Sequence, residues 1–140
     1  MTYLLDTNAI SEWVKPRPDP GIVRWLDEVD EDRTYLSVLT IGELRKGIDR
    51  LPHGRRHDQL DRWVTTDLPA RFGDRMLPVD VTVADEWGRL LAHAEMAGTP
   101  IGGVDGLIAA TAKVHRLAVV TRDVGHLQHS GVELISPWHG

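Results

Sequence analysis

Four carboxylates stand where the sequence predicts strands to end or helices to begin. Asp6 follows the first apolar run of the chain, and Asp123 follows the apolar run LAVVT. Glu43 lies near the start of one predicted helix, and Asp105 begins another. If these positions share one edge of a sheet, the four acids repel each other unless a cation lies among them. Hard oxygen ligands favour Mg²⁺ or Mn²⁺ over zinc, and such ions usually serve phosphate chemistry.

The elements that position these acids alternate between strand and helix. Strands are predicted at residues 3–5, 34–38, 75–80, 117–121 and 131–136. Helices are predicted within residues 19–30, 39–51, 51–68, 81–98 and 105–116. This alternation is typical of an α/β three-layer sandwich with a central, mostly parallel sheet. Ligands bind such sheets outside the carboxyl ends of the strands, where the four acids are expected to meet.

Local signals support several of these elements. Asp19 and Pro20 are expected to be the N-cap and first residue of a helix. The segment 75–80 contains a proline, which suits an edge strand. The segment 105–116 is small and apolar nearly all round, which predicts a buried central helix. We find no internal repeat and no dividing linker, so residues 1–140 are expected to form a single domain.

Composition limits the function classes. The chain has 140 residues and no cysteine, which excludes disulfides, thiolate metal sites and thiol nucleophiles. A net charge of −5 argues against binding nucleic acid through global positive charge, but a nuclease with clustered acids remains compatible with it. Neither a signal peptide nor an apolar stretch of ~20 residues is found, so we expect a soluble cytoplasmic protein without membrane contact.

Each acid also has an ordinary structural interpretation. Asp6 and Asp123 could be turn residues, and Asp105 could be the N-cap of its helix. The stretch TIGE at residues 40–43 matches a capping box, in which a threonine caps the helix and Glu43 reaches back to the chain. No single acid decides between these alternatives. Their joint placement favours a site.

Four stretches of the chain resemble the motifs of PIN-domain ribonucleases, specifically VapC-type toxins of type II toxin–antitoxin modules. YLLDTNAISEW resembles the opening aspartate motif, and LSVLTIGELRKGI resembles the motif of a strand followed by a glutamate. IGGVDGLIAATAKVHRLAVVTRDVGHL resembles the aspartate helix, the next strand and the final aspartate. GVELISPW resembles the closing strand of the FitB-like branch. These stretches run from residue 3 to residue 138 and cover nearly the whole chain.

The resemblance implies a function and its partners. It implies Mg²⁺- or Mn²⁺-dependent cleavage of RNA, a homodimer that can join a larger toxin–antitoxin assembly, and inhibition by a small VapB-like antitoxin that reaches into the acidic pocket. Asn8 and Thr121 match the family's polar residues beside the first and last aspartates, where they are expected to hold the carboxylates by hydrogen bonds. His126 departs from the pattern, because many relatives have an acid there.

The resemblance also assigns the family's acidic metal-binding set to this chain: Asp6, Glu43, Asp105 and Asp123. Asp6 and Asp105 are expected to ligate a first ion directly. Asp123 would complete that site or hold a second ion. Glu43 would bind metal through water or orient the attacking water. No side-chain nucleophile is required, because the water attacks the phosphodiester in line.

Basic residues follow the predicted glutamate motif. Arg45 and Lys46, just beyond Glu43, are the best candidates for contacts with RNA phosphates. The alternative is a solvated charged surface, since aspartates interleave with the basic residues of this region: Asp49, Asp58 and Asp61.

Two other functions compete with a ribonuclease. A catalytically silent PIN-fold binding module should lack one or more of the acids, and this chain keeps all four. A phosphatase with an aspartate nucleophile should have a second aspartate two positions after Asp6, and Asn8 stands there.

Overall fold

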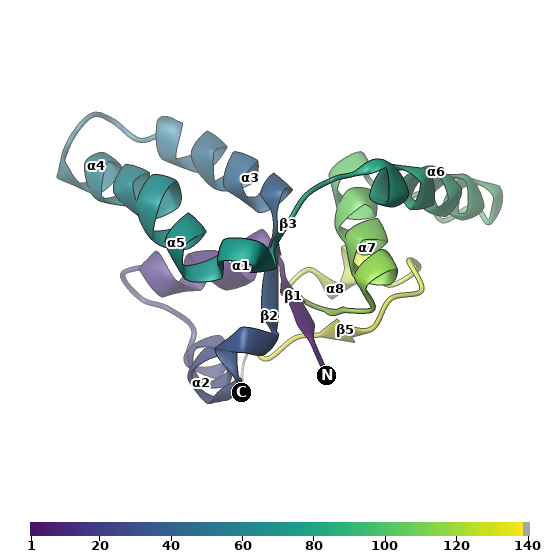
Figure 1. Ribbon diagram of the computed structural model, residues 1–140, viewed down its shortest axis with the longest axis horizontal. Coiled ribbons are helices and arrows are strands. Elements are labelled where there is room, and N and C mark those ends of the chain that lie inside the picture. Colours follow the sequence, from purple (N-terminus) through teal and green to yellow (C-terminus); the bar gives the residue numbers. More distant parts are fainter. Residues whose placement is uncertain (139–140) are drawn as a thin grey trace.

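One central sheet of five parallel strands organises the computed structural model, which describes residues 1–138 (Figure 1). The strands are β1 (Tyr3–Leu5), β2 (Thr34–Ser37), β3 (Met76–Leu77), β4 (Ala118–Val120) and β5 (Leu134–Ile135). Their order across the sheet is β3-β2-β1-β4-β5, and every neighbouring pair is parallel. The predicted α/β fold is confirmed, with β3 at an edge as predicted, although this strand is shorter than residues 75–80 and ends before Pro78. Residues 139 and 140, the end of the predicted 1–140 domain, lie outside the described residues.

Helices fill the connections between the strands. They are α1 (Thr7–Ile10), α2 (Pro20–Glu28), α3 (Val38–Asp49), α4 (Arg55–Arg62), α5 (Leu68–Phe72), α6 (Val81–Met96), α7 (Gly103–His115) and α8 (Val124–Leu127). Short 3₁₀ segments lie at η1 (Ser11–Val14), η2 (Glu31–Arg33) and η4 (Gly73–Arg75), and a π-helical segment lies at η3 (Trp63–Asp67). None of the helices in residues 1–138 is both long and apolar enough to cross a membrane.

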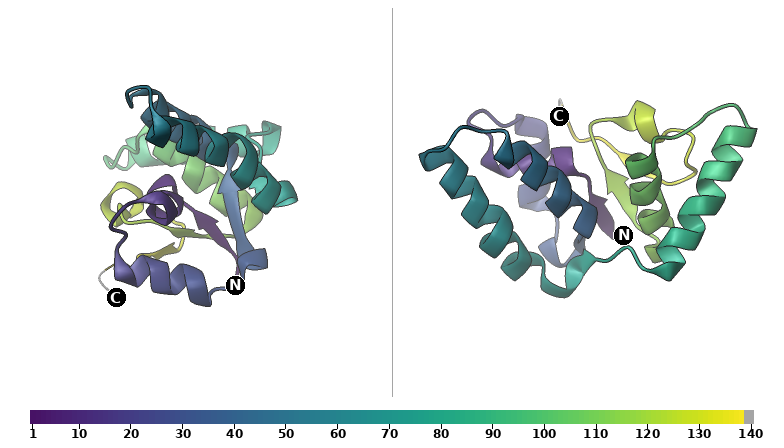
Figure 2. Two further views of the ribbon diagram at one scale, coloured as in Figure 1. Left: turned by 90° about the vertical axis from the view of Figure 1, so that its left-hand side faces the viewer. Right: turned by 90° about the horizontal axis from the view of Figure 1, so that it is seen from above.

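The helices form two groups, one on each face of the sheet (Figures 1 and 2). Leu5 and Val120 belong to a core shared with the group that includes α2, α3 and α5. Leu4 and Val119, one residue earlier on the same strands, belong to the opposite core with α6 and α7. Because successive side chains of a strand alternate between faces, a strand buried on both sides reads as a continuous apolar run. The three-layer architecture is therefore confirmed.

Two helices follow their sequence signals closely. The Asp19 side chain accepts hydrogen bonds from the backbone N–H groups of Gly21 (2.9 Å) and Ile22 (3.2 Å), and Pro20 begins α2, as predicted. Helix α7 is the predicted buried helix and packs against α6. Gly106 permits this close packing, because a Cβ atom there would lie 2.9 Å from Cδ2 of Leu91.

The predicted helix at residues 51–68 starts later and ends later than expected. It begins at Arg55 in α4 and continues through η3 and α5 to Phe72. At the junction the Leu68 N–H donates to the Trp63 carbonyl, which is the wider π-helical spacing. Pro69 lacks the N–H that would continue the α-helical pattern, which accounts for the local widening.

Candidate active site

Asp6 lies at the carboxyl end of β1, the middle strand of the sheet. Its backbone N–H donates to the Val120 carbonyl on β4 at 2.9 Å. Its carboxylate accepts hydrogen bonds from the Thr7 N–H at Oδ1 and from the Thr121 hydroxyl at Oδ2, both at 2.8 Å. The first bond makes Asp6 the N-cap of α1, a one-turn helix that the sequence did not predict. The second bond aims the carboxylate toward the end of β4.

The electrostatic surroundings of Asp6 oppose its ionisation. Burial is the largest effect and raises the pKa of Asp6 above its ordinary value. The hydrogen bonds from Thr121 and Thr7 lower this pKa, while the negative charges of Glu43 and Asp105 raise it further. Two other predicted site acids, Glu43 and Asp105, thus lie near enough to Asp6 to repel its charge, although all three are widely separated in sequence. A cation near Asp6 would favour its ionised form and so offset the effects of burial and of the neighbouring negative charges.

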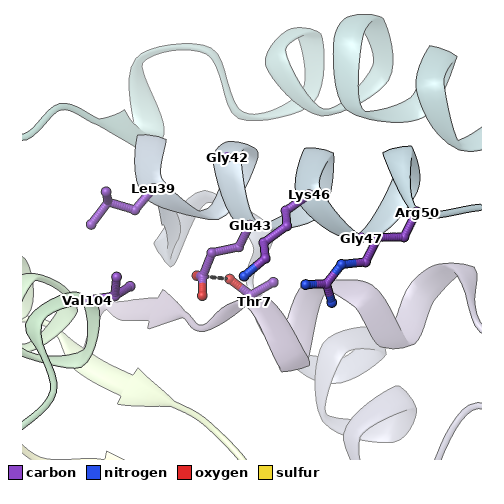
Figure 3. Close-up of a pocket in the computed structure, with 8 residues that line it drawn as sticks. All are labelled: Thr7, Leu39, Gly42, Glu43, Lys46, Gly47, Arg50 and Val104. Atoms are coloured by element: carbon purple, nitrogen blue, oxygen red, sulfur yellow. Dashed lines mark hydrogen bonds between the residues drawn. The ribbon is translucent and has the colours of Figure 1, made fainter.

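Glu43 reaches across from α3 to α1. The Thr7 hydroxyl donates to Glu43 Oε1 at 2.6 Å (Figure 3). The same hydroxyl lies 3.3 Å from the Thr40 hydroxyl. The capping-box interpretation of residues 40–43 is wrong, because α3 begins three residues earlier and Ser37 is its N-cap. Thr40 is buried inside the helix, and the Glu43 side chain is therefore free to cross to the end of β1.

Asp105 lies in the first turn of α7. The interpretation of Asp105 as an N-cap is wrong, because Gly102 occupies that position. Oδ2 of the Asp105 carboxylate lies 3.9 Å from Nδ1 of His126 on α8. The resemblance to PIN-domain ribonucleases led us to expect an acid in place of His126, whereas this chain places an imidazole beside Asp105.

Asp123 is joined to the end of β1 through Asn8. The Asn8 side-chain amide donates to Asp123 Oδ2 at 3.0 Å and lies 3.4 Å from the Thr121 hydroxyl. The Arg122 N–H donates to the Asn8 carbonyl oxygen at 3.1 Å, and the Asp123 N–H donates to the Thr121 hydroxyl at 3.0 Å. Asp123 is the N-cap residue of α8, but its side chain makes no capping bond there. Asn8 and Thr121 therefore tie the first and last acids into one network.

The donor set of this region is made of carboxylate oxygens around Asp6. Within residues 1–138, no three His, Cys, Asp or Glu side chains lie close enough together to hold a metal ion by themselves. Mg²⁺ commonly binds one or two protein carboxylates and keeps several of its waters. The oxygen donors, together with a buried Asp6 whose ionisation is disfavoured, fit an ion of that kind.

An open pocket of about 570 Å³ lies beside the acids. Figure 3 shows its lining: Thr7, Leu39, Gly42, Glu43, Lys46, Gly47, Arg50 and Val104. A second cavity of about 280 Å³ adjoins it and shares Thr7 and Glu43.

The two basic residues favoured by the sequence separate in the structure. Lys46 lines the pocket, whereas Arg45 pairs with Asp61 of α4 at 2.8 Å and with Asp49 at 3.3 Å. Arg50 lines the pocket, although the sequence did not favour it over its neighbours. Helical spacing could have found it, because positions i+3 and i+7 share the face of Glu43, whereas Arg45 at i+2 does not.

Comparison with known proteins identifies the family. Residues 3–131 match the PIN domain. The chain belongs to the PIN-domain family. It is 40% identical to Toxin FitB of Neisseria gonorrhoeae over 136 residues, which cover 97% of this chain and 98% of FitB. It is 36% identical to the VapC ribonuclease Y4jK of Sinorhizobium fredii over 96% of each chain. The predicted resemblance to VapC-type proteins of the FitB-like branch is thereby confirmed.

The fold of this PIN domain also matches solved structures. A chain in the structure of FitAB bound to an IR36 DNA fragment aligns with a TM-score of 0.93 and 37% identity. The alignment covers 99% of this chain and 97% of the FitAB chain. The likeness therefore extends over the strands, the helices and the loops that hold the acids.

Proposed function

We propose that this PIN domain, spanning residues 1–140, is a Mg²⁺- or Mn²⁺-dependent endoribonuclease and the toxin of a toxin–antitoxin pair. The observation that carries the proposal is that two other acids, Glu43 and Asp105, act on Asp6 at the end of the central strand. Burial and the charges of Glu43 and Asp105 raise the pKa of Asp6, which is the condition that a bound cation relieves. The names of the relatives FitB and Y4jK, a toxin and a ribonuclease, support the same assignment.

We propose Asp6 and Asp105 as direct ligands of the ion, with Asp123 completing that site or holding a second ion. Bound waters would supply the remaining ligands, because the side chains of residues 1–138 do not by themselves form a set of three around one ion. When bound, the cation lowers the pKa of a coordinated water and offsets negative charge on the phosphate. Thr7 and Thr121 fix the orientation of the Asp6 carboxylate through the two hydrogen bonds already described. Asn8, also held by the Arg122 N–H, fixes Asp123.

Glu43 has a different proposed role. Its Oε1 is held by the Thr7 hydroxyl at 2.6 Å, and it faces an open pocket that can admit substrate. From this position Glu43 orients the attacking water or accepts its proton, as a general base within reach of one water does.

The proposed partners are a VapB-like antitoxin and a second copy of this chain, within a larger toxin–antitoxin assembly in the cytoplasm. The structural relatives support this, because one of them is described as FitAB bound to DNA and another as FitAcB. An antitoxin that inserts a basic segment beside the acids would block the site by occupying the place of the cation and the RNA.

The proposal is tested by RNA cleavage with controlled metal content. We expect purified protein to cut RNA with Mg²⁺ or Mn²⁺, and EDTA to abolish cutting. Asp6→Asn and Asp105→Asn should each reduce cleavage at least ~10²-fold, since each removes a charge from the reacting centre. Circular dichroism should show both variants folded. Asp74→Asn, a matched charge change at an exposed position, should cut normally. Cleavage by Asp6→Asn at the wild-type rate would refute the mechanism.

A further inference from the structure

Two glycines of α3 face open space in the part of the chain that the structure describes. Gly42 and Gly47 are exposed, and a Cβ atom built at either meets nothing within 4 Å. Glycine weakens a helix relative to alanine, so packing normally justifies it. Gly106 shows the contrast, because a Cβ atom there would clash with Leu91 at 2.9 Å. The two α3 glycines line the pocket beside Glu43, and the parts of its wall that they form carry no side chain.

Two cations line the same pocket. Lys46 and Arg50 are exposed, and within residues 1–138 neither side chain has an ion-pair or hydrogen-bond partner. Arg45, between them and Glu43 in sequence, is by contrast held by Asp49 and Asp61. The helical rise places Arg50 about 10 Å along α3 from Glu43. Figure 3 shows Glu43, Lys46 and Arg50 on the pocket side of α3.

We propose that this groove holds single-stranded RNA on one side of the bond that is cut. In this arrangement the RNA backbone lies against Gly42 and Gly47, and successive phosphates contact Lys46 and Arg50. The proposal rests on the proposed ribonuclease function and specifies how that site binds its substrate.

The chemistry of the groove favours a nucleic-acid backbone. Glycines allow a ligand backbone to approach closely, and unpaired cations in a row match a row of phosphates. Contacts with phosphates position a strand and do not read its bases. The groove is therefore expected to fix the path of the RNA and to leave base preference to other contacts.

The test is binding of a short, fluorescently labelled single-stranded RNA in EDTA, measured by anisotropy at several salt concentrations. Lys46→Ala and Arg50→Ala should each make the slope of log K against log salt shallower by ~0.7, the value for one phosphate contact on a single strand. The double variant should lose ~1.4. Arg89→Ala, on α6 in the other helical group, should leave the slope unchanged.

Filling the groove provides a test that does not alter charge. Gly47→Leu should weaken RNA binding about tenfold while the thermal midpoint stays equal or rises, because leucine favours helix more than glycine does. Gly88→Leu is the matched control, since Gly88 lies in α6 and a Cβ atom there also meets nothing within 4 Å. It should bind RNA as the wild type does.

The outcomes separate this proposal from the proposed function. If the wild type cuts RNA but the groove variants keep wild-type affinity and salt slope, the groove proposal is refuted and the ribonuclease stands. If these variants instead lose affinity only for an acidic peptide such as polyglutamate, the groove binds a protein and the RNA proposal is refuted. If the wild type neither binds nor cuts RNA, both proposals fail.

Discussion

Neutral hydrogen-bonding side chains determine how the acids of this site are held. Thr121 is fully buried, and its hydroxyl donates to Asp6 while accepting from the Asp123 N–H. Thr7 acts similarly between Asp6 and Glu43, with its N–H on one acid and its hydroxyl on the other. Thr121 and Thr7 therefore fix the directions of the Asp6 and Glu43 carboxylates before any ligand binds.

The raised pKa of Asp6 predicts a pH-dependent stability. Because the folded-state pKa lies above the ordinary value of 3.8, the folded protein holds more protons than the unfolded chain between these two values. The free energy of unfolding therefore falls as pH rises through that window, and the loss persists at higher pH. Asparagine has no charge and caps helices as well as aspartate does. In EDTA at pH 7, Asp6→Asn should therefore unfold at a higher urea concentration than the wild type.

The difference between Asp6→Asn and the wild type should disappear below the window, where Asp6 is protonated in both states. The exposed Asp74→Asn serves as the control for a change of net charge and should not show this pH dependence. The prediction fails if Asp6→Asn is less stable than the wild type by the same amount at pH 7 and at low pH. That result would mean that the buried charge of Asp6 does not destabilise the folded protein.

The position of Asp105 depends on how α7 packs against α6. The Trp87 indole N–H of α6 donates to the Gly103 carbonyl at 3.0 Å, at the start of α7. Gly106, the residue after Asp105, lies against Leu91 and Trp87. The contact between these helices therefore determines where the first turn of α7, and with it the carboxylate, meets the sheet.

Gly106→Ala is expected to destabilise the protein by about 1–3 kcal/mol, the usual cost of overpacking. Its Cβ atom would lie 2.9 Å from Leu91 and 3.2 Å from the Trp87 ring, and the indole is held by its hydrogen bond. Urea unfolding measures the effect, and the shift of α7 should also lower RNA cleavage. Gly88→Ala, on α6 without such contacts, should stabilise by up to ~1 kcal/mol. Equal stability of the two variants would show that α6 and α7 adapt without strain.

The elements that the sequence predicts well are those with a strong local or periodic signal. The strands β1 and β4 appear as apolar runs because both of their faces are buried, and Asp19 followed by Pro20 is a complete helix start. Helix α1 has only four residues, which is too short to produce a hydrophobic period. The capping-box match at residues 40–43 failed because Ser37 caps the helix earlier, and local pattern alone does not rank two possible caps.

The order of the strands explains why distant acids meet. The chain proceeds from β1 to β2 and β3 in one direction, then returns to place β4 and β5 on the other side of β1. Ligands bind open parallel sheets where the strand order reverses in this way. Asp6 lies at that reversal, with α3 following β2 and Asp123 following β4. The sequence could place each acid at a strand or helix end, but only the strand order brings those ends to the same edge of the sheet.

Because the site draws on β1, α3, α7 and the end of β4, a cation bound there should stabilise the whole fold. Only the folded state gathers the acids, so binding adds RT ln(1 + [M]/Kd) to the free energy of unfolding, about 2.7 kcal/mol at one hundred times Kd. We expect Mg²⁺ or Mn²⁺ to raise the urea midpoint of the wild type at pH 7, compared with NaCl at matched ionic strength. The gain should shrink as the pH falls toward the raised pKa of Asp6, because protons then compete with the cation for its carboxylate.

The same titration on Asp6→Asn separates a specific site from general screening of an acidic protein. The variant keeps the fold and the other three acids but lacks the central carboxylate, so its metal-dependent gain in stability should be lost. Asp74→Asn changes the net charge equally and should keep the full gain. Equal stabilisation of Asp6→Asn and the wild type would mean that the cation acts on the overall negative charge, and the metal site at the end of β1 would have to be abandoned.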